Sequence, residues 1–350
     1  MRRRAIAYAL LSAVLFGAST PLAKLLVGAI NPLALAGLLY LGSGISLAAW
    51  LALRNLRPAS PHERASFGAP DWPWLAAAIV AGGLAGPTLL MYGLARTDAA
   101  SASLLLNLEP VLTAALAWVV FRENVDRRVF LGMAAIVGGG IVLSWQQLPQ
   151  ARALAGPLLI AGACLAWALD NNLTRRISGG DPVLIAAAKG LVAGAINLAL
   201  ALWIGARLPA PGALLLAGIV GLLGYGVSLV LFIMALRDLG TARTGAYFSV
   251  APFFGAALAL YIFGAPTSPA FWAAGVLMAI GVWLHVTERH EHEHVHEPLT
   301  HAHEHLHDSH HAHAHDFAWD GVEPHVHVHR HPRLRHRHPH YPDLHHRHRH

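Results

Sequence analysis

The sequence is poor in cysteine, lysine and charge, and each shortage excludes a class of protein. Its single cysteine, Cys164, rules out an intrachain disulfide. Only 13% of the 350 residues are charged, whereas soluble domains carry about a quarter, so the chain is not a soluble protein. The two lysines, Lys24 and Lys189, lack the Gly-Lys-Ser/Thr setting of a nucleotide-binding loop. We therefore expect no built-in ATP hydrolysis, no enzymatic activity and no required cofactor.

Long apolar runs occupy most of the chain. Hydrophobic residues make up 55% of it, and the mean hydropathy is +0.47. Runs of about 18 to 24 apolar residues are long enough to cross a bilayer. We predict an all-α integral membrane protein in which ten helices span the membrane, at residues 5–26, 32–53, 72–94, 99–121, 128–145, 154–172, 183–204, 212–236, 242–263 and 270–287. The longest connection, 54–71, is rich in proline and arginine and is predicted to be a surface loop.

The distribution of arginine predicts the orientation. If the N-terminus is cytoplasmic, thirteen arginines lie in the inside loops and three in the outside loops. By the positive-inside rule, both termini are then cytoplasmic and the protein lies in the inner or plasma membrane. This topology also explains the net charge of +6 without nucleic acid. Residues 1–19 resemble a signal peptide as well, but an uncleaved first span is favoured because residues 13–24 have a counterpart later in the chain.

That counterpart is part of an internal repeat. Residues 103–121 align with residues 245–263 at a shift of 142, so that Pro110 falls on Pro252. Each half has five spans, an odd number, so the halves must be inverted, as in alternating-access transporters. We place the first repeat at 1–146, the second at 147–288 and a tail at 289–350. Other spans match as well, pairing Phe16 with Trp167 and Lys24 with Arg175 at a shift of 151, and Gly132 with Gly275 at a shift of 143.

These features resemble the EamA-type members of the drug/metabolite transporter superfamily. The resemblance is carried by LFGASTPLAK in the first span, by ARTDAASASLLLNLEPVLTAALAWVVFRE around the fourth and by LRDLGTARTGAYFSVAPFFGAALALYIF around the ninth. It covers residues 5–287 and implies ten helices in two inverted five-helix repeats that carry or export small molecules. The family often has Trp-Gly where this chain has Phe16-Gly17. It often ends the fourth helix of a repeat with an acid, present as Glu123 but replaced by Ala265.

Glu109 is the strongest candidate for a functional residue. It lies near the middle of the fourth span, where an ionisable group is costly unless it faces protein or water. There it could bind and release a proton or contact a cationic substrate. The structural alternative is that it caps the backbone freed by Pro110 or pairs with a neighbouring helix. Glu109 aligns with Ala251 and so has no counterpart in the second repeat.

Other polar residues in the spans complete the predicted site. Asp170 and Asn171 could line the inward mouth of a cavity, or Asp170 could pair with Arg175 or Arg176. Lys189 could contact a substrate anion, balance Asp170 or Glu109, or snorkel to the headgroups. The predicted substrate or coupling residues are Glu109, Asn107, Pro110, Asp170, Asn171 and Lys189.

The tail has a different composition, with 23 of the 25 histidines between residues 290 and 350. Such a tract is predicted to be disordered without metal. Alternate residues of an extended chain share a face, so neighbouring imidazoles could bind Zn, Ni, Co or Cu. The tail could instead bind metal only incidentally, or respond to pH. The predicted ligands are His290, His292, His294, His296, His301, His303, His305, His307, His311, His313, His315, His325, His327, His329 and His331.

The function that we expect is secondary transport of a small metabolite or drug-like molecule by alternating access. Transport is driven by a gradient, with protons the first candidate, or is facilitative. One alternative is a divalent transition-metal carrier or exporter regulated by the tail, and another is a membrane metal buffer or sensor that transports nothing. The expected partners are the lipid bilayer, a small-molecule substrate, metal ions on the tail and a second copy of the chain, but no nucleic acid.

Overall fold

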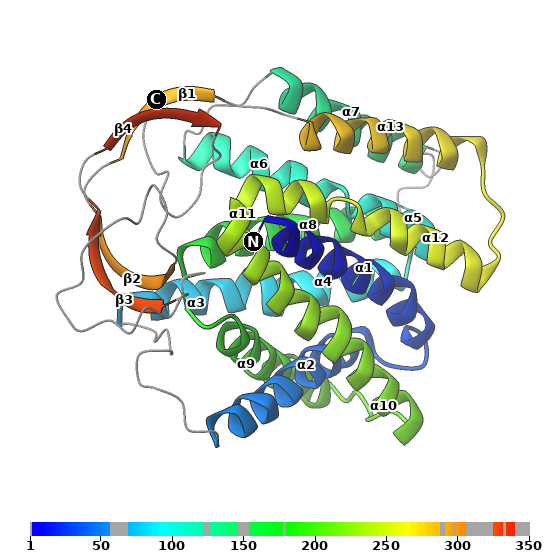
Figure 1. Ribbon diagram of the computed structural model, residues 1–350. Coiled ribbons are helices and arrows are strands. Elements are labelled where there is room, and N and C mark those ends of the chain that lie inside the picture. Colours follow the sequence, from blue (N-terminus) through cyan, green and yellow to red (C-terminus); the bar gives the residue numbers. More distant parts are fainter. Residues whose placement is uncertain are drawn as a thin grey trace.

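The computed structural model describes residues 2–56, 69–121, 127–145, 154–177 and 180–287 and, in the tail, 291–296, 299–305, 325–331 and 334–339. Helices dominate it (Figure 1). The α-helices are α1 (Arg2–Leu26), α2 (Pro32–Asn55), α3 (Trp72–Ala78), α4 (Gly86–Leu94), α5 (Ala99–Leu105), α6 (Leu108–Phe121), α7 (Arg127–Trp145), α8 (Ala155–Ile177), α9 (Pro182–Trp203), α10 (Pro211–Val220), α11 (Ser228–Phe248), α12 (Ala251–Phe263) and α13 (Pro269–Val286). A 3₁₀ turn, η2 (Ala69–Asp71), precedes α3.

The helices confirm the all-α membrane fold. Within the described residues, six helical segments are long and apolar enough to cross a membrane, and three shorter apolar helices accompany them. Each of the ten predicted spans is helical over most of its described residues, and the sixth corresponds to α8. Most of the predicted surface loop at 54–71 lies outside the described residues.

Helices α2 and α9 begin with the same local chemistry, at positions 150 residues apart. The side chain of Asn31 accepts hydrogen bonds from the backbone N–H groups at the start of α2, and Asp181 does the same for α9. A proline follows each cap, where its missing N–H costs nothing. Asp181 also forms an ion pair with Arg54, which joins the start of α9 to the end of α2.

The fourth and ninth spans are each interrupted. The fourth breaks between Leu105, the last residue of α5, and Leu108, the first of α6. The ninth breaks in the same way between α11 and α12. Pro110 and Pro252 lie just inside the new helices, where a proline prevents the hydrogen bond to the residue four positions earlier. The predicted helix break is therefore present in both repeats.

The third and eighth spans each contain a π-helical segment, which the sequence analysis did not predict. These segments are η3 (Ile79–Ala85), between α3 and α4, and η4 (Gly221–Val227), between α10 and α11. They are 142 residues apart at both ends, the same shift that relates the two prolines. Single-turn π segments inside helices occur frequently at functional sites. Their equivalent positions show that the two inverted repeats share this irregularity.

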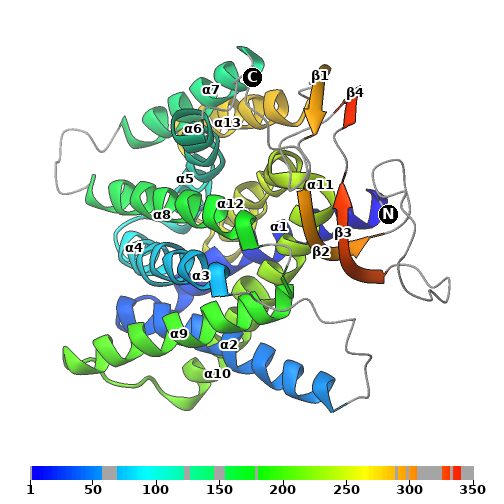
Figure 2. The same ribbon diagram turned by 90° about the vertical axis from the view of Figure 1, so that its left-hand side faces the viewer.

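Small residues allow the helices to cross closely. A Cβ atom added to Gly17 of α1 would lie 2.2 Å from the carbonyl oxygen of Ala251, and one added to Gly44 of α2 would lie 2.3 Å from the backbone nitrogen of Leu191. Such crossings need a hydrogen atom in place of a side chain. They bring α1 against α12 and α2 against α9. Figure 2 shows α2 and α9 at one end of the bundle and α7 with α13 at the other.

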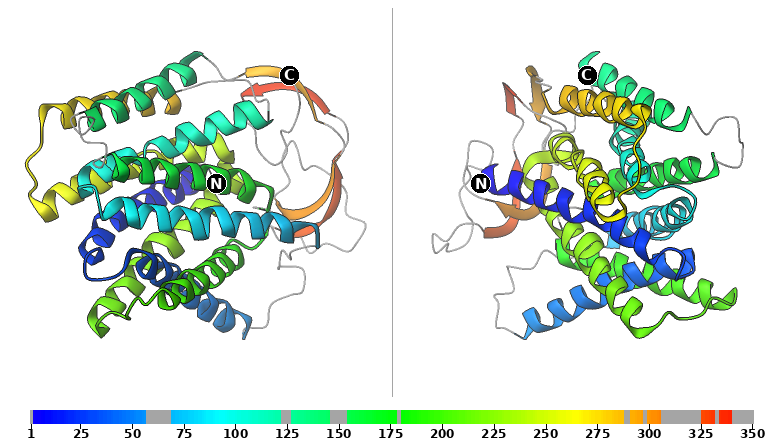
Figure 3. Two further views of the ribbon diagram at one scale, coloured as in Figure 1. Left: turned by 180° about the vertical axis from the view of Figure 1, so that it is seen from behind. Right: turned by 90° about the vertical axis from the view of Figure 1, so that its right-hand side faces the viewer.

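The tail contains strands in the part that the structure describes, where the sequence predicted disorder. Strand β1 (Glu291–His296) pairs with β4 (Leu334–Pro339), and β2 (Leu299–His305) pairs with β3 (His325–His331), both antiparallel. The alternation of histidine with other residues has the period of two that suits an extended strand. The strands lie beside the helices (Figure 3). Five of the predicted ligands lie outside the described residues, namely His290, His307, His311, His313 and His315.

Candidate functional site

A pocket lies among the helices of both repeats, with about 500 Å³ of empty space that includes open solvent at its mouth. Helices α1, α2 and α6 contribute to it from the first repeat, and α8, α9, η4 and α11 from the second. Small-molecule sites typically lie between helices and are lined by aromatic side chains with a few polar groups. Its polar side chains are Glu109, Asp170, Asn171, Lys189 and Ser228, and its aromatic ones are Phe16, Tyr40, Trp167, Tyr225, Phe232 and Phe248.

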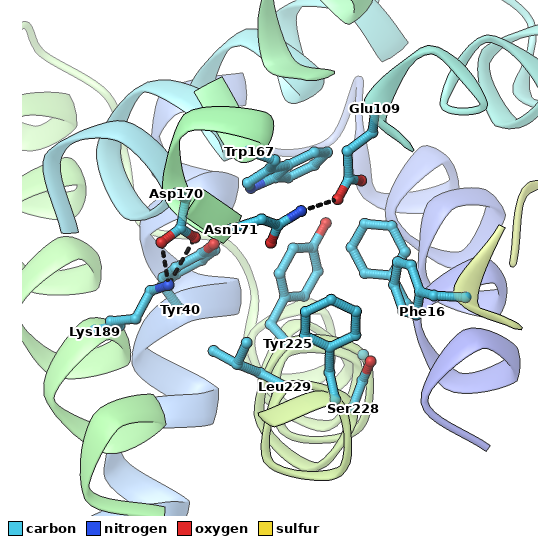
Figure 4. A pocket seen from close by; sticks show the side chains of 13 residues that line it. Phe16, Tyr40, Glu109, Trp167, Asp170, Asn171, Lys189, Tyr225, Ser228 and Leu229 are labelled. Carbon is cyan, nitrogen blue, oxygen red and sulfur yellow. Dashed lines mark hydrogen bonds and ion pairs between the residues drawn. The ribbon is translucent and has the colours of Figure 1, made fainter. Parts of the chain in front are cut away.

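Glu109 is the second residue of α6 and points into the pocket (Figure 4). The helix break places its carboxylate in the first turn of a half-helix, where the backbone dipole favours negative charge. Its side chain is 8% exposed, and Asn171 of α8 donates a hydrogen bond of 2.8 Å to Oε1. Among the described residues, Glu109 forms no ion pair. A buried carboxylate without a cation is therefore available to an incoming positive charge.

Asp170 and Lys189 form a closed ion pair at the other side of the pocket (Figure 4). The ammonium of Lys189 lies 2.6 Å from each carboxylate oxygen of Asp170. Thr174 completes the cluster, because its hydroxyl donates to Asp170 at 2.9 Å and lies 3.3 Å from Lys189 Nζ. Lys189 is 1% exposed, so it does not snorkel. Of the alternatives for Asp170, pairing with Arg176 is wrong, because the Arg176 guanidinium stacks 4.4 Å over the ring of Trp74.

Phe16 is the centre of an aromatic wall. Its ring lies 5.5 Å from Trp167, 6.0 Å from Tyr225 and 5.4 Å from Phe248, measured between ring centroids. The wall extends from Tyr225 to Tyr40 at 5.4 Å and from Phe248 to Phe232 at 4.9 Å. These rings come from five separate helical segments. Aromatic pairs at such separations stabilise one another and form a firm surface.

The π segment η3 supports part of this wall. The carbonyl oxygen of Gly82 accepts hydrogen bonds from Tyr40 Oη at 2.7 Å and from Trp167 Nε1 at 3.0 Å. The next carbonyl, of Gly83, accepts one from the side chain of Asn197 at 3.2 Å. The irregular backbone thus holds the polar atoms of two pocket rings, which leaves their apolar parts to line the pocket.

The structure brings four of the six predicted site residues together in the pocket, namely Glu109, Asp170, Asn171 and Lys189. Asn107 and Pro110 do not line it. Asn107 is fully buried, and its amide donates to the carbonyl oxygen of Leu104 and lies 3.8 Å from the sulfur of Met278. Asn107 therefore contacts α13 rather than the pocket.

The aromatic lining was missed by the sequence analysis. Aromatic residues are common in spans, and no spacing along the chain groups residues from five segments. One signal was available, since the repeat pairs Phe16 with Trp167 and these two rings contact each other. No group of three or more histidine, cysteine or acidic side chains that could hold a metal occurs among the residues searched, which are those the structure describes.

Comparison with known proteins gives consistent matches. The model of the EamA-like transporter family matches twice, over residues 3–145 and 154–287. An uncharacterized transporter from Methanothermobacter thermautotrophicus is 27% identical over 287 residues, covering 77% of this chain and 82% of that protein. The uncharacterized transporter YyaM from Bacillus subtilis is 29% identical over 114 residues, covering 31% of this chain and 37% of that protein. A solved crystal structure superimposes with a TM-score of 0.63 at 19% identity, covering 82% of this chain and 98% of the other.

Proposed function

Because the chain belongs to the EamA-like transporter family, we propose that it is a gradient-driven secondary transporter. In this proposal it moves a small metabolite or drug-like molecule by alternating access through the pocket at Glu109. The observation that carries the proposal is that both repeats line this pocket and that one buried carboxylate in it, that of Glu109, has no cationic partner among the described residues. Substrate sites at the interface of inverted repeats, beside interrupted helices, are typical of such carriers. The proposed orientation has both termini in the cytoplasm of an inner or plasma membrane.

The test is uptake by proteoliposomes. Purified protein is reconstituted, a pH gradient is imposed in either direction, and the vesicles are incubated with a pool of amines, amino acids, carboxylates, sugars and peptides. Mass spectrometry then identifies what enters. At least one compound should accumulate to a higher level in these vesicles than in empty liposomes. Its accumulation should be much lower with Glu109→Gln, because glutamine keeps an oxygen that accepts the hydrogen bond from Asn171 but carries no charge. If a folded protein moves nothing from the pool under either gradient, the proposal is contradicted.

A metal role of the tail is a second proposal, and the register of its strands supports it. His301, His303 and His305 of β2 lie opposite His329, His327 and His325 of β3. Opposite residues of an antiparallel pair share a face, as do alternate residues of a strand. Seven histidine positions, these six and His331 of β3, therefore lie on one face of this sheet. Imidazole suits Zn, Ni, Co and Cu. In the other sheet His292 and His294 lie opposite His338 and His336, which are additional to the predicted ligands.

Metal transport through the helices has less support than metal binding by the tail. Asp170, one of the two pocket acids, is occupied by Lys189, and family membership argues against a buffer or sensor that transports nothing. Cells lacking the protein can separate these alternatives if they express the full chain, a chain ending at Arg289, or Glu109→Gln. Accumulation of Ni, Co, Zn and Cu that depends on Glu109 would favour a metal carrier. Dependence on the tail alone would favour a buffer, and metal handling unchanged in all three would exclude a metal role.

A further inference from the structure

We propose that the pocket selects organic cations: a monovalent ammonium compound with an apolar or aromatic body. This inference rests on the proposed function and specifies its substrate class. The juxtaposition that carries it is the unpaired carboxylate of Glu109 beside the aromatic wall around Phe16. Each of these two features attracts a cation by a different physical mechanism.

The charges of the pocket disfavour anions and zwitterions as substrates. The pocket contains two carboxylates and one ammonium. Lys189 is surrounded by both oxygens of Asp170 and by Thr174, so it has little capacity left for the carboxylate of an amino acid or another anion. Glu109 receives one hydrogen bond from Asn171 and no ion pair from the described residues. When Glu109 is ionised, the pocket carries one negative charge that no described residue balances, which suits a ligand with one positive charge and no negative one.

The aromatic wall favours a cation with a large, weakly hydrated body. The faces of aromatic rings carry negative potential and attract ammonium groups, most strongly where water is excluded. Tyr40 and Trp167 use their polar atoms on the Gly82 carbonyl, so they offer ring surface to a ligand. Phe16, Phe232 and Phe248 have no polar atoms to offer. A hydrated metal ion would have to lose its water against these rings without gaining ligands, whereas an alkyl or aryl ammonium would bury its apolar part among them.

Binding of benzyltrimethylammonium to the purified full chain in detergent tests this inference. Its control ligand is neopentylbenzene, which has the same shape with carbon in place of the charged nitrogen, and phenylacetate serves as the anion. Titration calorimetry should detect binding of the cation and at least roughly tenfold weaker binding of both controls, because a desolvated charge pair and cation–π contacts depend on the positive charge.

Variants connect the binding to the two features. Glu109→Gln should weaken binding of the cation by roughly tenfold or more, and Phe16→Leu should weaken it by a smaller factor. Phe130→Leu is the matched control, because Phe130 of α7 is 53% exposed and does not line the pocket. This variant should bind the cation as tightly as the unmodified protein does. Thermal unfolding of each variant shows whether it is folded. A folded Phe16→Trp restores an aromatic face and should recover part of the affinity.

Several results would overturn the inference. Binding of neopentylbenzene as tight as that of the cation would show that only apolar contact matters. Unchanged cation binding by folded Glu109→Gln would show that the carboxylate is not used. If proteoliposomes transport an amino acid or an anion while benzyltrimethylammonium does not bind at millimolar concentration, the substrate class is wrong although the proposed function stands. If no pooled compound is transported, the proposed function itself fails.

Discussion

Lys189 and Asp170 form an ion pair that is almost inaccessible to solvent, with the ammonium 2.6 Å from each carboxylate oxygen. A buried pair of this kind differs from a surface pair, because removing one member leaves the other charged and without a partner. Its effect on the protein is therefore best measured by changing both members, first one at a time and then together.

We expect Asp170→Asn and Lys189→Met each to lower the free energy of unfolding by about 3 to 5 kcal/mol, because each leaves an uncompensated buried charge. The double variant should recover most of that loss. The measurement is a double-mutant cycle from chemical denaturation in detergent micelles. Losses that simply add in the double variant would show that the two residues are not coupled.

Asn171 should act on ligand binding through Glu109. Asn171→Leu removes the donor to Glu109 Oε1, and hydrogen bonds to charged groups contribute about 1.5 to 3 kcal/mol. We expect binding of benzyltrimethylammonium to weaken by roughly tenfold or more. Asn172→Leu is the control on the same helix, since the Asn172 amide donates to the backbone carbonyls of Ala168 and Thr113 and not to Glu109. Equal affinities for the two variants would contradict this role for Asn171.

Gly82 should tolerate no side chain. A Cβ at this position would lie 1.9 Å from Asp170 Oδ2, so Gly82→Ala must displace the carboxylate or the π segment. We expect a marked loss of thermal stability and of transport in proteoliposomes. Gly218→Ala, in α10, provides the comparison because its Cβ would meet no atom within 4 Å, and alanine is the better helix former by about 1 kcal/mol. A melting temperature of Gly82→Ala equal to that of the unmodified protein would show that Gly82 and Asp170 are not in tight contact.

Metal binding by the tail should depend on one face of the β2–β3 pair. Replacing His301, His303 and His305 together by asparagine removes three of the seven histidines on that face. The control replaces Thr300, Ala302 and Glu304, which alternate with them on the opposite face, by asparagine as well. Equilibrium dialysis with Ni should show fewer ions bound per chain for the first variant than for the second. The same number of bound ions in both would mean that the face is irrelevant.

The sequence predicted the fold better than the site. Hydropathy located the ten helical segments, because crossing a bilayer imposes a length and an apolar composition that can be counted. The aligned prolines, Pro110 and Pro252, mark the two helix breaks, because each proline removes one specific backbone hydrogen bond. Glu109 was identified because an acid in a span is costly.

The rest of the site depends on contacts between distant segments. Lys189 had three candidate roles, and only the fold, in which α8 and α9 both pack against η3, selects Asp170 as its partner. The same holds for Lys24, whose ammonium donates hydrogen bonds to the carbonyl oxygens of Leu94 and Thr97, about 70 residues away in the chain. The π segments could not be predicted, since a glycine-rich stretch such as Gly82-Gly83 is equally compatible with an α-helix that packs closely.

The two equivalent π segments face different chemistry. Gly82 lies against the carboxylate of Asp170, whereas Gly224, 142 residues later, lies against the hydroxyl-bearing side chain of Ser19. The proposed carrier would reverse its facing direction by exchanging the conformations of its two repeats. The surroundings of the buried Asp170–Lys189 pair then change, whereas the equivalent position near Gly224 has only Ser19, which carries no charge. The inward- and outward-facing states then differ in free energy even without substrate. An empty carrier would accordingly favour one facing direction, and its apparent affinities and maximal rates for influx and efflux would differ.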